Sequence, residues 1–267
     1  MSDHPATQPS LFIPHGGGPC FFMPDPRGTW TKMRNYLESL GNSLPEKPLA
    51  ILVVSGHWEE RAFTFTGADE HPGLIFDYYG FPPETYQLTW PARGAPWLAA
   101  RGAELLREAG LPTGIDPERG FDHGVFVPLK VAFPEADIPV VQMSLHASLN
   151  PAMHVAAGRA LAPLREEGVL ILGSGMSFHN LRAMGDPRVG EPSAQFDKWL
   201  AHAAADLPAE RAIQLAHWAE APFARLCHPR EEHLIPLMVA AGASDTPGTH
   251  DFADQVLGGT VSAFRFA

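Results

Sequence analysis

The chain has 267 residues, is 45% hydrophobic and carries a formal net charge of −11 at pH 7. This length and apolar content fit one folded domain with a buried core. The acidic balance argues against a nucleic-acid-binding surface, which needs a basic stripe, and against attachment to anionic membranes.

No apolar run approaches the roughly 20 residues needed to cross a bilayer. The first residues, Met1 to His4, lack the basic and apolar regions of a secretory signal. We therefore expect a cytoplasmic protein without membrane contact. Cys20 and Cys227 do not form a CxxC pair, and a reducing compartment would keep them as free thiols. The sequence leaves a homo-oligomer open.

Six short segments have the composition of β-strands. Four are almost wholly apolar, as strands buried on both faces of a parallel sheet are: 10–14, 49–56, 138–145 and 168–173. Two more, 63–66 and 261–266, alternate apolar and polar residues, as edge strands do.

Helices are predicted between these strands, at 95–109, 150–166, 193–205 and 232–241. Asn150 is placed as an N-cap, with Pro151 in the first helical turn. Strands that alternate with helices of this length predict βαβ units. We therefore expect a single α/β domain over residues 1–267, with a mainly parallel central sheet flanked by helices. The Pro- and Gly-rich segment 67–96 is predicted to be a long, functional loop.

Histidine is the most distinctive residue type, with 13 copies beside four tyrosines and six tryptophans. His15, His57 and His179 each follow one of the apolar strands. Ligands of open α/β sheets bind beyond the carboxyl ends of the strands, so these three side chains can converge. Neutral imidazole is the commonest metal ligand and an acid or base near neutral pH, although a single histidine at a strand end is more often structural.

Three glycines follow His15, and such a run costs backbone entropy unless something must approach closely. A metal with bound substrate would explain Gly16 to Gly18, as would an anion held by backbone N–H groups. The glycines strengthen the case that His15 belongs to a binding site.

Two other histidines have contexts that leave two interpretations open. His123 follows Asp122 in a predicted tight turn, where the carboxylate either bonds locally or orients a neighbouring imidazole. His233 follows Glu231 and Glu232 at a predicted helix start. The helix dipole suffices to explain the acidic residues, but it disfavours a cationic histidine. A neutral, metal-bound imidazole would suit that position. The remaining histidines are predicted to be surface or packing residues: His4, His71, His146, His154, His202, His217 and His250.

Five motifs taken together resemble the class III extradiol ring-cleaving dioxygenases of the LigB superfamily, and most closely their 4,5-DOPA dioxygenase branch. They occur in the family's order and span nearly the whole chain. They are PHGGGP (14–19), VVSGHWE (53–59), FDHGVFVPL (121–129), GSGMSFHNL (173–181) and EEHLIPLMVAAGA (231–243).

The resemblance implies a metal site at the carboxyl ends of the strands, where O2 cleaves the ring of a catechol-type substrate, DOPA-like or related. It implies that His15, His57 and His233 are the metal ligands, although much of the superfamily has a glutamate at the third position. It also implies that His179 is the acid/base and that His123 contacts oxygen or substrate. One divalent metal per chain is expected. Iron(II) would serve ring cleavage, and zinc also suits three neutral imidazoles.

Two other functions stay open at this point. A zinc-dependent hydrolase on the same scaffold would activate water at a three-histidine site. A non-catalytic metal-binding protein would need no acid/base groups, so the presence of His179 and His123 argues against it. His228 is a candidate to hold a substrate carboxylate. The expected aromatic lining of the pocket comes from the long loop: Phe76, Tyr78, Tyr79, Phe81 and Trp90.

Overall fold

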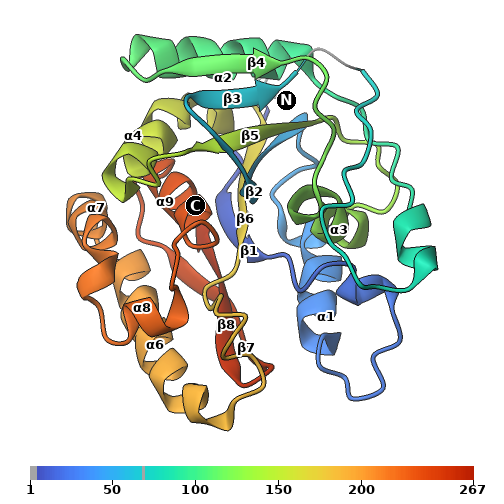
Figure 1. The fold of residues 1–267 in the computed structure, drawn as a ribbon. Coiled ribbons are helices and arrows are strands. Elements are labelled where there is room, and N and C mark those ends of the chain that lie inside the picture. The colour runs from blue at the N-terminus through green and yellow to red at the C-terminus, as the bar shows by residue number, and fades with distance from the viewer. Residues whose placement is uncertain (1–4, 68–69) are drawn as a thin grey trace.

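The apolar runs form the centre of one β-sheet in a computed structural model that describes residues 5–67 and 70–267. The described residues build eight strands in the order β4-β3-β5-β2-β6-β1-β8-β7 (Figure 1). In chain order the strands are β1 Ser10–Pro14, β2 Ala50–Glu60, β3 Phe63–Thr66, β4 Thr113–Asp116, β5 Val140–His146, β6 Val169–Gly175, β7 Thr249–Val256 and β8 Gly259–Phe266.

The four central strands, β5, β2, β6 and β1, are parallel to one another. They are apolar on both faces because helices cover both sides of a parallel sheet. Towards the edges the pairing becomes antiparallel, between β3 and β5 on one side and through β8 and β7 on the other. The predicted α/β class with a mainly parallel sheet is confirmed.

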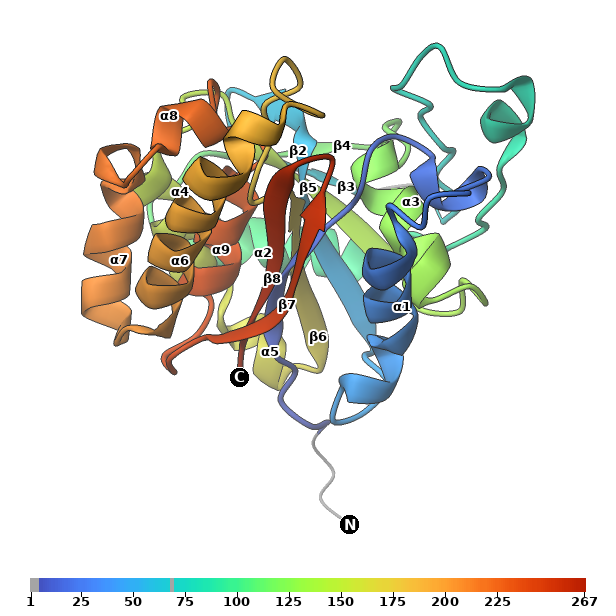
Figure 2. The same ribbon diagram turned by 90° about the horizontal axis from the view of Figure 1, so that it is seen from below.

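Helices lie on both sides of this sheet, as Figures 1 and 2 show. On one face α9 packs against β1, β2 and β6, and α4 packs on α9. On the other face α3 contacts β2 and β6, and α1 packs on α3. The helices are α1 Thr31–Ser39, α2 Pro96–Glu108, α3 His123–Ala132, α4 Pro151–Leu161, α5 Pro163–Glu166, α6 Gly190–Ala205, α7 Pro208–Ala216, α8 Ala224–Cys227 and α9 Ile235–Gly242.

Several elements differ from the sequence prediction. The expected turn around His123 is instead the start of α3. The sequence pattern did not indicate this helix, because nine of its ten residues are buried and it has no polar face. The expected helix 150–166 divides into α4 and α5 before Pro163, although the Asn150 cap is confirmed by a bond from Met153 N–H at 2.9 Å. The last predicted helix begins only at Ile235. The helices α1 and α7 and the strands β4 and β7 were not predicted.

The long segment before α2 is irregular over residues 70–95, apart from a short 3₁₀ helix, Pro83–Gln87. Leu74 pairs with Phe121 just before α3, and Gly94 pairs with Val140 at the start of β5, which ties this segment to the sheet. None of the described helices is both long and apolar enough to serve as a membrane span.

Glycines allow α4 and α9 to pack closely. A Cβ atom on Gly158 would overlap the carbonyl of Val239, and one on Gly242 would overlap the carbonyl of Val155. Gly158→Ala is therefore expected to lower the free energy of unfolding by about 1–3 kcal/mol, measured by urea denaturation. Alanine is the better helix former, so a net loss must come from the steric overlap. The control is Gly73→Ala, where a Cβ meets nothing within 4 Å. Equal stability of the two variants would contradict this account.

Candidate metal centre

Three histidines from separate elements meet at the carboxyl end of the central strands. His15 directly follows β1, and its backbone N–H donates to the carbonyl of Gly175 at 3.2 Å, which continues the pairing with β6. His57 lies within β2, where the register with β5 shifts between Val54 and Glu59. Such a bulge re-aims side chains out of the regular alternation, and here it contains His57.

His233 lies in the segment that leads into α9, and two glycines let this segment approach the strand ends. Its carbonyl accepts a hydrogen bond from Met176 N–H at 3.0 Å. A Cβ on Gly175 would overlap that carbonyl, and a Cβ on Gly56 would lie 3.0 Å from the carbonyl of Glu232. The glycines in two of the sequence motifs therefore serve this close approach of backbone.

The rings of these three histidines turn their Nε2 atoms toward one another. Nε2 of His57 lies 3.4 Å from Nε2 of His15 and 3.1 Å from Nε2 of His233. Burial, and then the charges of neighbouring histidines, hold the pKa of His15 and of His233 well below the usual range. Burial, and then His123, lower the pKa of His57 to about 3. All three rings are therefore neutral near pH 7.

The opposite nitrogen of each ring shows where its single proton lies. Nδ1 of His15 is 2.9 Å from the carbonyl oxygen of the following glycine, which can only accept. Nδ1 of His57 is 3.4 Å from the Asp77 carboxylate, and Nδ1 of His233 is 2.8 Å from the Glu232 carboxylate. Each proton therefore resides on Nδ1, and the three Nε2 lone pairs face one another.

Facing lone pairs repel unless a cation lies between them, so the donor set fits a metal ion. Two imidazole nitrogens bound about 2.1 Å from one ion, at angles of 90–110°, lie about 3.0–3.4 Å apart. The separations of 3.1 and 3.4 Å agree with this. An Nδ1–H donated to a carboxylate or carbonyl is also what holds metal-binding histidines in place.

A fourth histidine, His123, approaches the same point from the first residue of α3. Its ring centroid is 4.0 Å from that of His57, and the ligand atoms of His15, His57 and His123 lie within 4.8 Å of one another. Its Nδ1 donates to Asp77 Oδ1 at 2.7 Å, and its backbone N–H donates to the same oxygen at 2.9 Å. Asp77 therefore holds the Nδ1 side of this ring, and Nε2 is the nitrogen that remains for contact with a ligand.

A fifth histidine, His179, follows β6 and stacks on His233, with ring centroids 3.4 Å apart and an interplanar angle of 17°. Its Nδ1 lies 3.3 Å from Glu232 Oε1, the same oxygen that accepts from His233. Burial opposes ionisation of Glu232, but His179 and Arg230 beside it outweigh that effect and lower its pKa. Glu232 thus supports His233 and does not replace it.

Two carboxylates therefore organise the site, each joining two of the rings. Asp77 joins His57 to His123, and Glu232 joins His233 to His179. Burial opposes ionisation of Asp77, but its hydrogen bond from His123 and the neighbouring histidines lower its pKa overall. Sequence reasoning missed the role of Asp77, because the residue lies in the irregular segment 46 positions before His123.

Asp77→Asn is expected to weaken metal binding and turnover by about 10–100-fold, the usual effect of removing a carboxylate partner of a ligand histidine. The amide keeps the shape of the side chain but loses the charge that accepts both Nδ1–H groups. Metal dissociation constants are measured by competition with a chromophoric chelator. Asp137→Asn, at an exposed ion pair with Lys47, is the matched control. Unchanged metal affinity and turnover in Asp77→Asn would refute this role.

Asp122 does not orient an imidazole. It is fully buried, and its carboxylate accepts hydrogen bonds from Ser55 Oγ at 2.8 Å, from Arg119 at 3.3 Å and from Gln142. These bonds fix the start of α3 against β2 and β5, so Asp122 positions His123 through the backbone.

The prediction that His228 holds a substrate carboxylate is wrong. The ring is fully buried, its Nε2 donates to the carbonyl of Ser177 at 2.9 Å, and it packs edge-on against Phe196 and Trp218. Burial lowers its pKa to about 4. His228 is a neutral core residue.

One cavity of about 510 Å³ opens onto the histidine cluster. Tyr78, Tyr79 and Phe81 line it as predicted, whereas Phe76 packs on Phe126 and Trp90 is buried. Within the described parts of the chain, five histidines contribute to the lining: His15, His57, His123, His179 and His233. The described histidines that were predicted to be surface or packing residues do not line this cavity. His4, which belongs to the same group, lies outside the described residues.

The glycine run beside the cavity has a different cause from the one expected. Gly16 and Gly18 have φ angles of +82° and +52°, which favour glycine. A Cβ on Gly16 would overlap the Cys20 sulfur, and one on Gly18 would lie 2.9 Å from Phe81. A Cβ on Gly17 would lie 3.3 Å from Trp30, so the run accommodates three of the protein's own cavity-lining side chains, Cys20, Trp30 and Phe81.

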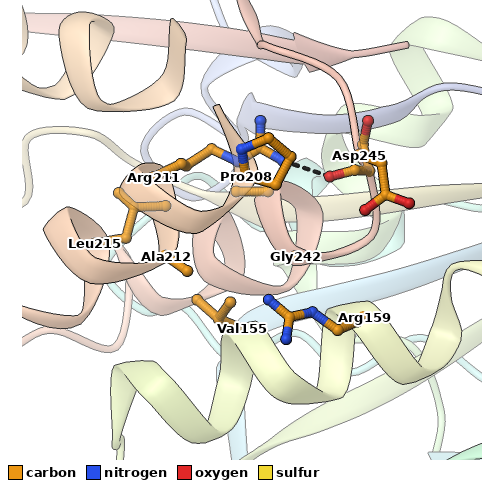
Figure 3. Close-up of a pocket in the computed structure, with 10 residues that line it drawn as sticks. Val155, Arg159, Pro208, Arg211, Ala212, Leu215, Gly242 and Asp245 are labelled. Carbon is orange, nitrogen blue, oxygen red and sulfur yellow. Dashed lines mark hydrogen bonds between the residues drawn. The ribbon is translucent and has the colours of Figure 1, made fainter. Parts of the chain in front are cut away.

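A second, much smaller cavity of about 10 Å³ lies between α4, α7 and the end of α9 (Figure 3). Arg211 in its wall donates to the carbonyls of Ser244 and Thr246. The volume suffices for about one water molecule. The bonds from Arg211 fix the segment that follows α9 against α7.

A family model described as the catalytic LigB subunit of aromatic ring-opening dioxygenase matches residues 10–264. Dioxygenase tasH from Hapsidospora irregularis is 41% identical, over 94% of this chain and 82% of the relative. A 4,5-DOPA dioxygenase extradiol from Beta vulgaris is 38% identical, over 91% and 90% of the two chains. A protein of the same name from Escherichia coli is also 38% identical, over 89% and 85%.

The fold has a counterpart among solved structures. A crystal structure of an Escherichia coli protein superposes with a TM-score of 0.77 and 31% sequence identity, covering 97% of this chain and all of the other. The family match spans all five motifs and every histidine of the cluster. The chain therefore belongs to the LigB family of aromatic ring-opening dioxygenases and is a ring-cleaving oxidoreductase.

Proposed function

We propose that this protein opens the ring of a catechol with O2, by extradiol cleavage, at one divalent metal ion held by His15, His57 and His233. The observation that carries the proposal is the set of three facing Nε2 lone pairs at the floor of the cavity. His233 is preferred to His123 as the third ligand because its Nε2 lies 3.1 Å from that of His57. The relatives named 4,5-DOPA dioxygenase support the reaction class.

Iron(II) at this position would supply Lewis acidity toward the two catechol oxygens and a path for electrons from the ring to O2. Both atoms of O2 enter the ring-opened product, so no external reductant is required. An aromatic ring bound over the histidine cluster would lie among Tyr78, Phe81 and the glycine run, which line the cavity.

Proton transfer is assigned to His179 and His123, which line the cavity and direct Nδ1 to Glu232 and Asp77, so that Nε2 is the nitrogen left to meet the substrate. His179 Nε2 accepts a proton from a catechol hydroxyl and returns it when the oxygen–oxygen bond breaks. The imidazolium formed in between is stabilised by Glu232, which lies 3.3 Å from its Nδ1. His123 contacts O2 or the second catechol oxygen, and Asp77 stabilises its ring in the same manner.

Anaerobic reconstitution with iron(II), followed by oxygen-uptake measurements, tests this function. Uptake is expected with at least one member of a catechol panel that includes DOPA, caffeate, protocatechuate and 4-methylcatechol. The same protein loaded with zinc should consume no oxygen, because zinc has no redox chemistry. Zinc-dependent hydrolysis that is indifferent to oxygen, together with no uptake by the iron form, would establish the hydrolase alternative instead.

A further inference from the structure

We propose that the preferred substrate is a catechol whose ring substituent is uncharged and apolar, and that carboxylate-bearing catechols are poor substrates. This inference deepens the proposed function and rests on it. It comes from the walls of the cavity beyond the histidines. These walls are formed by Met23, Trp30, Tyr79, Leu181, Met184 and Leu257.

These residues come from three separate segments that meet over the histidine cluster. Met23 and Trp30 lie between β1 and α1, Leu181 and Met184 follow β6, and Leu257 lies at the turn between β7 and β8. The catechol oxygens must point to the floor, where the Nε2 atoms converge. A substituent on the far side of the ring therefore extends between thioether, indole and aliphatic side chains.

The charges around the cavity oppose a carboxylate in that position. Within the described chain no lysine or arginine lines the cavity. The cations nearest to the cluster are already paired, Arg230 with Glu59 at 2.5 and 2.6 Å and Arg119 with Asp122 at 3.3 Å. His228, the expected carboxylate partner, is a core residue.

The carboxylates behind the rings strengthen this preference. Asp77 and Glu232 each lie within 3.4 Å of two of the rings, so acidic side chains stand directly behind the floor of the cavity. A substrate carboxylate that lies against Met23, Trp30 and Met184 would lose part of its hydration without gaining a counter-ion, which costs free energy. An apolar substituent gains free energy from the same transfer.

A matched pair of ligands tests this inference: 3-(3,4-dihydroxyphenyl)propionic acid and its methyl ester, with DOPA and 4-propylcatechol as additional members. The ester and the acid place the same ring and chain in the cavity and differ in charge. Binding to the zinc-loaded full chain is measured by calorimetry, and turnover by oxygen uptake of the iron-loaded chain. The ester is expected to bind at least about tenfold more tightly than the acid, since burial of an unpaired charge is the term that differs. Equal or tighter binding of the acid would overturn the inference.

A designed cation provides the converse test. Leu181 is 69% exposed at the mouth, so Leu181→Arg should fold normally. It is expected to tighten binding of the acid relative to the ester by about tenfold, because one charge-assisted hydrogen bond is added. The controls are Leu207→Arg, at a residue 62% exposed and outside the cavity lining, and Arg182→Ala, which removes the exposed cation next to Leu181. Neither control should alter the ratio of acid to ester affinity.

Ligand binding and oxygen uptake together distinguish a failure of the proposed substrate preference from a failure of the proposed dioxygenase function. Oxygen uptake with the acid as good as with the ester would refute the substrate preference and leave the dioxygenase function intact. Absence of uptake with every catechol, combined with a tenfold binding preference for the ester, would refute the function and support the character of the cavity. A clear fall in affinity for the acid in Arg182→Ala would also overturn the inference, because a cation at the mouth would then already pair with the substrate carboxylate.

Discussion

His233→Ala is expected to weaken metal binding by more than about 100-fold, beyond the range for loss of a supporting partner, and to abolish ring cleavage. The reason is the position of its Nε2, 3.1 Å from that of His57, with its own proton directed to Glu232. The measurements are metal content after dialysis, determined by plasma emission spectroscopy, and the dissociation constant from chelator competition.

His123→Ala is the matched comparison, since this ring completes the other three-histidine set within reach of His15 and His57. We expect His123→Ala to keep its metal and to lose turnover. The opposite pattern, with metal lost from His123→Ala and kept in His233→Ala, would exchange the roles of the two histidines. Circular dichroism and thermal unfolding of both variants show whether a lost metal reflects a lost fold.

His179→Phe is expected to lower kcat by about 10²–10⁴-fold, the range for removal of a general acid/base. Phenylalanine retains the ring that stacks on His233 at 3.4 Å but has no nitrogen to take the catechol proton. Oxygen-uptake kinetics give kcat and KM, and calorimetry gives the affinity for 4-propylcatechol, which should change little.

Comparison with His179→Ala separates chemistry from packing. If stacking alone mattered, His179→Phe would keep its turnover and His179→Ala would lose it. If both variants lose turnover and retain metal, the nitrogen is the essential feature. A variant that fails to hold metal would instead make His179 part of the metal-binding set.

Much of the fold is readable in local patterns of the sequence. The runs 49–56 and 168–173 are continuously apolar, and the structure places them side by side as parallel β2 and β6. Helix α3 could not be predicted in this way, because a helix that is buried on all sides has no amphipathic period. Edge strand β7 could not be predicted either, because its exposed, polar residues resemble those of a loop.

The sequence by itself predicted that His15 and His57 lie at the carboxyl end of the sheet, because each comes at the end of a run of apolar residues, which is a local feature. His15 and His57 needed no more than that. Only the tertiary structure showed that His233, 176 positions from His57, turns its Nε2 toward that of His57. It also showed that Asp77 and Glu232 each lie beside Nδ1 of two rings. It also decided that His228 belongs to the core. Such assignments depend on contacts between distant segments, and side-chain orientation across those contacts follows from packing of the whole sheet and its helices. No local periodicity in the sequence encodes this side-chain orientation.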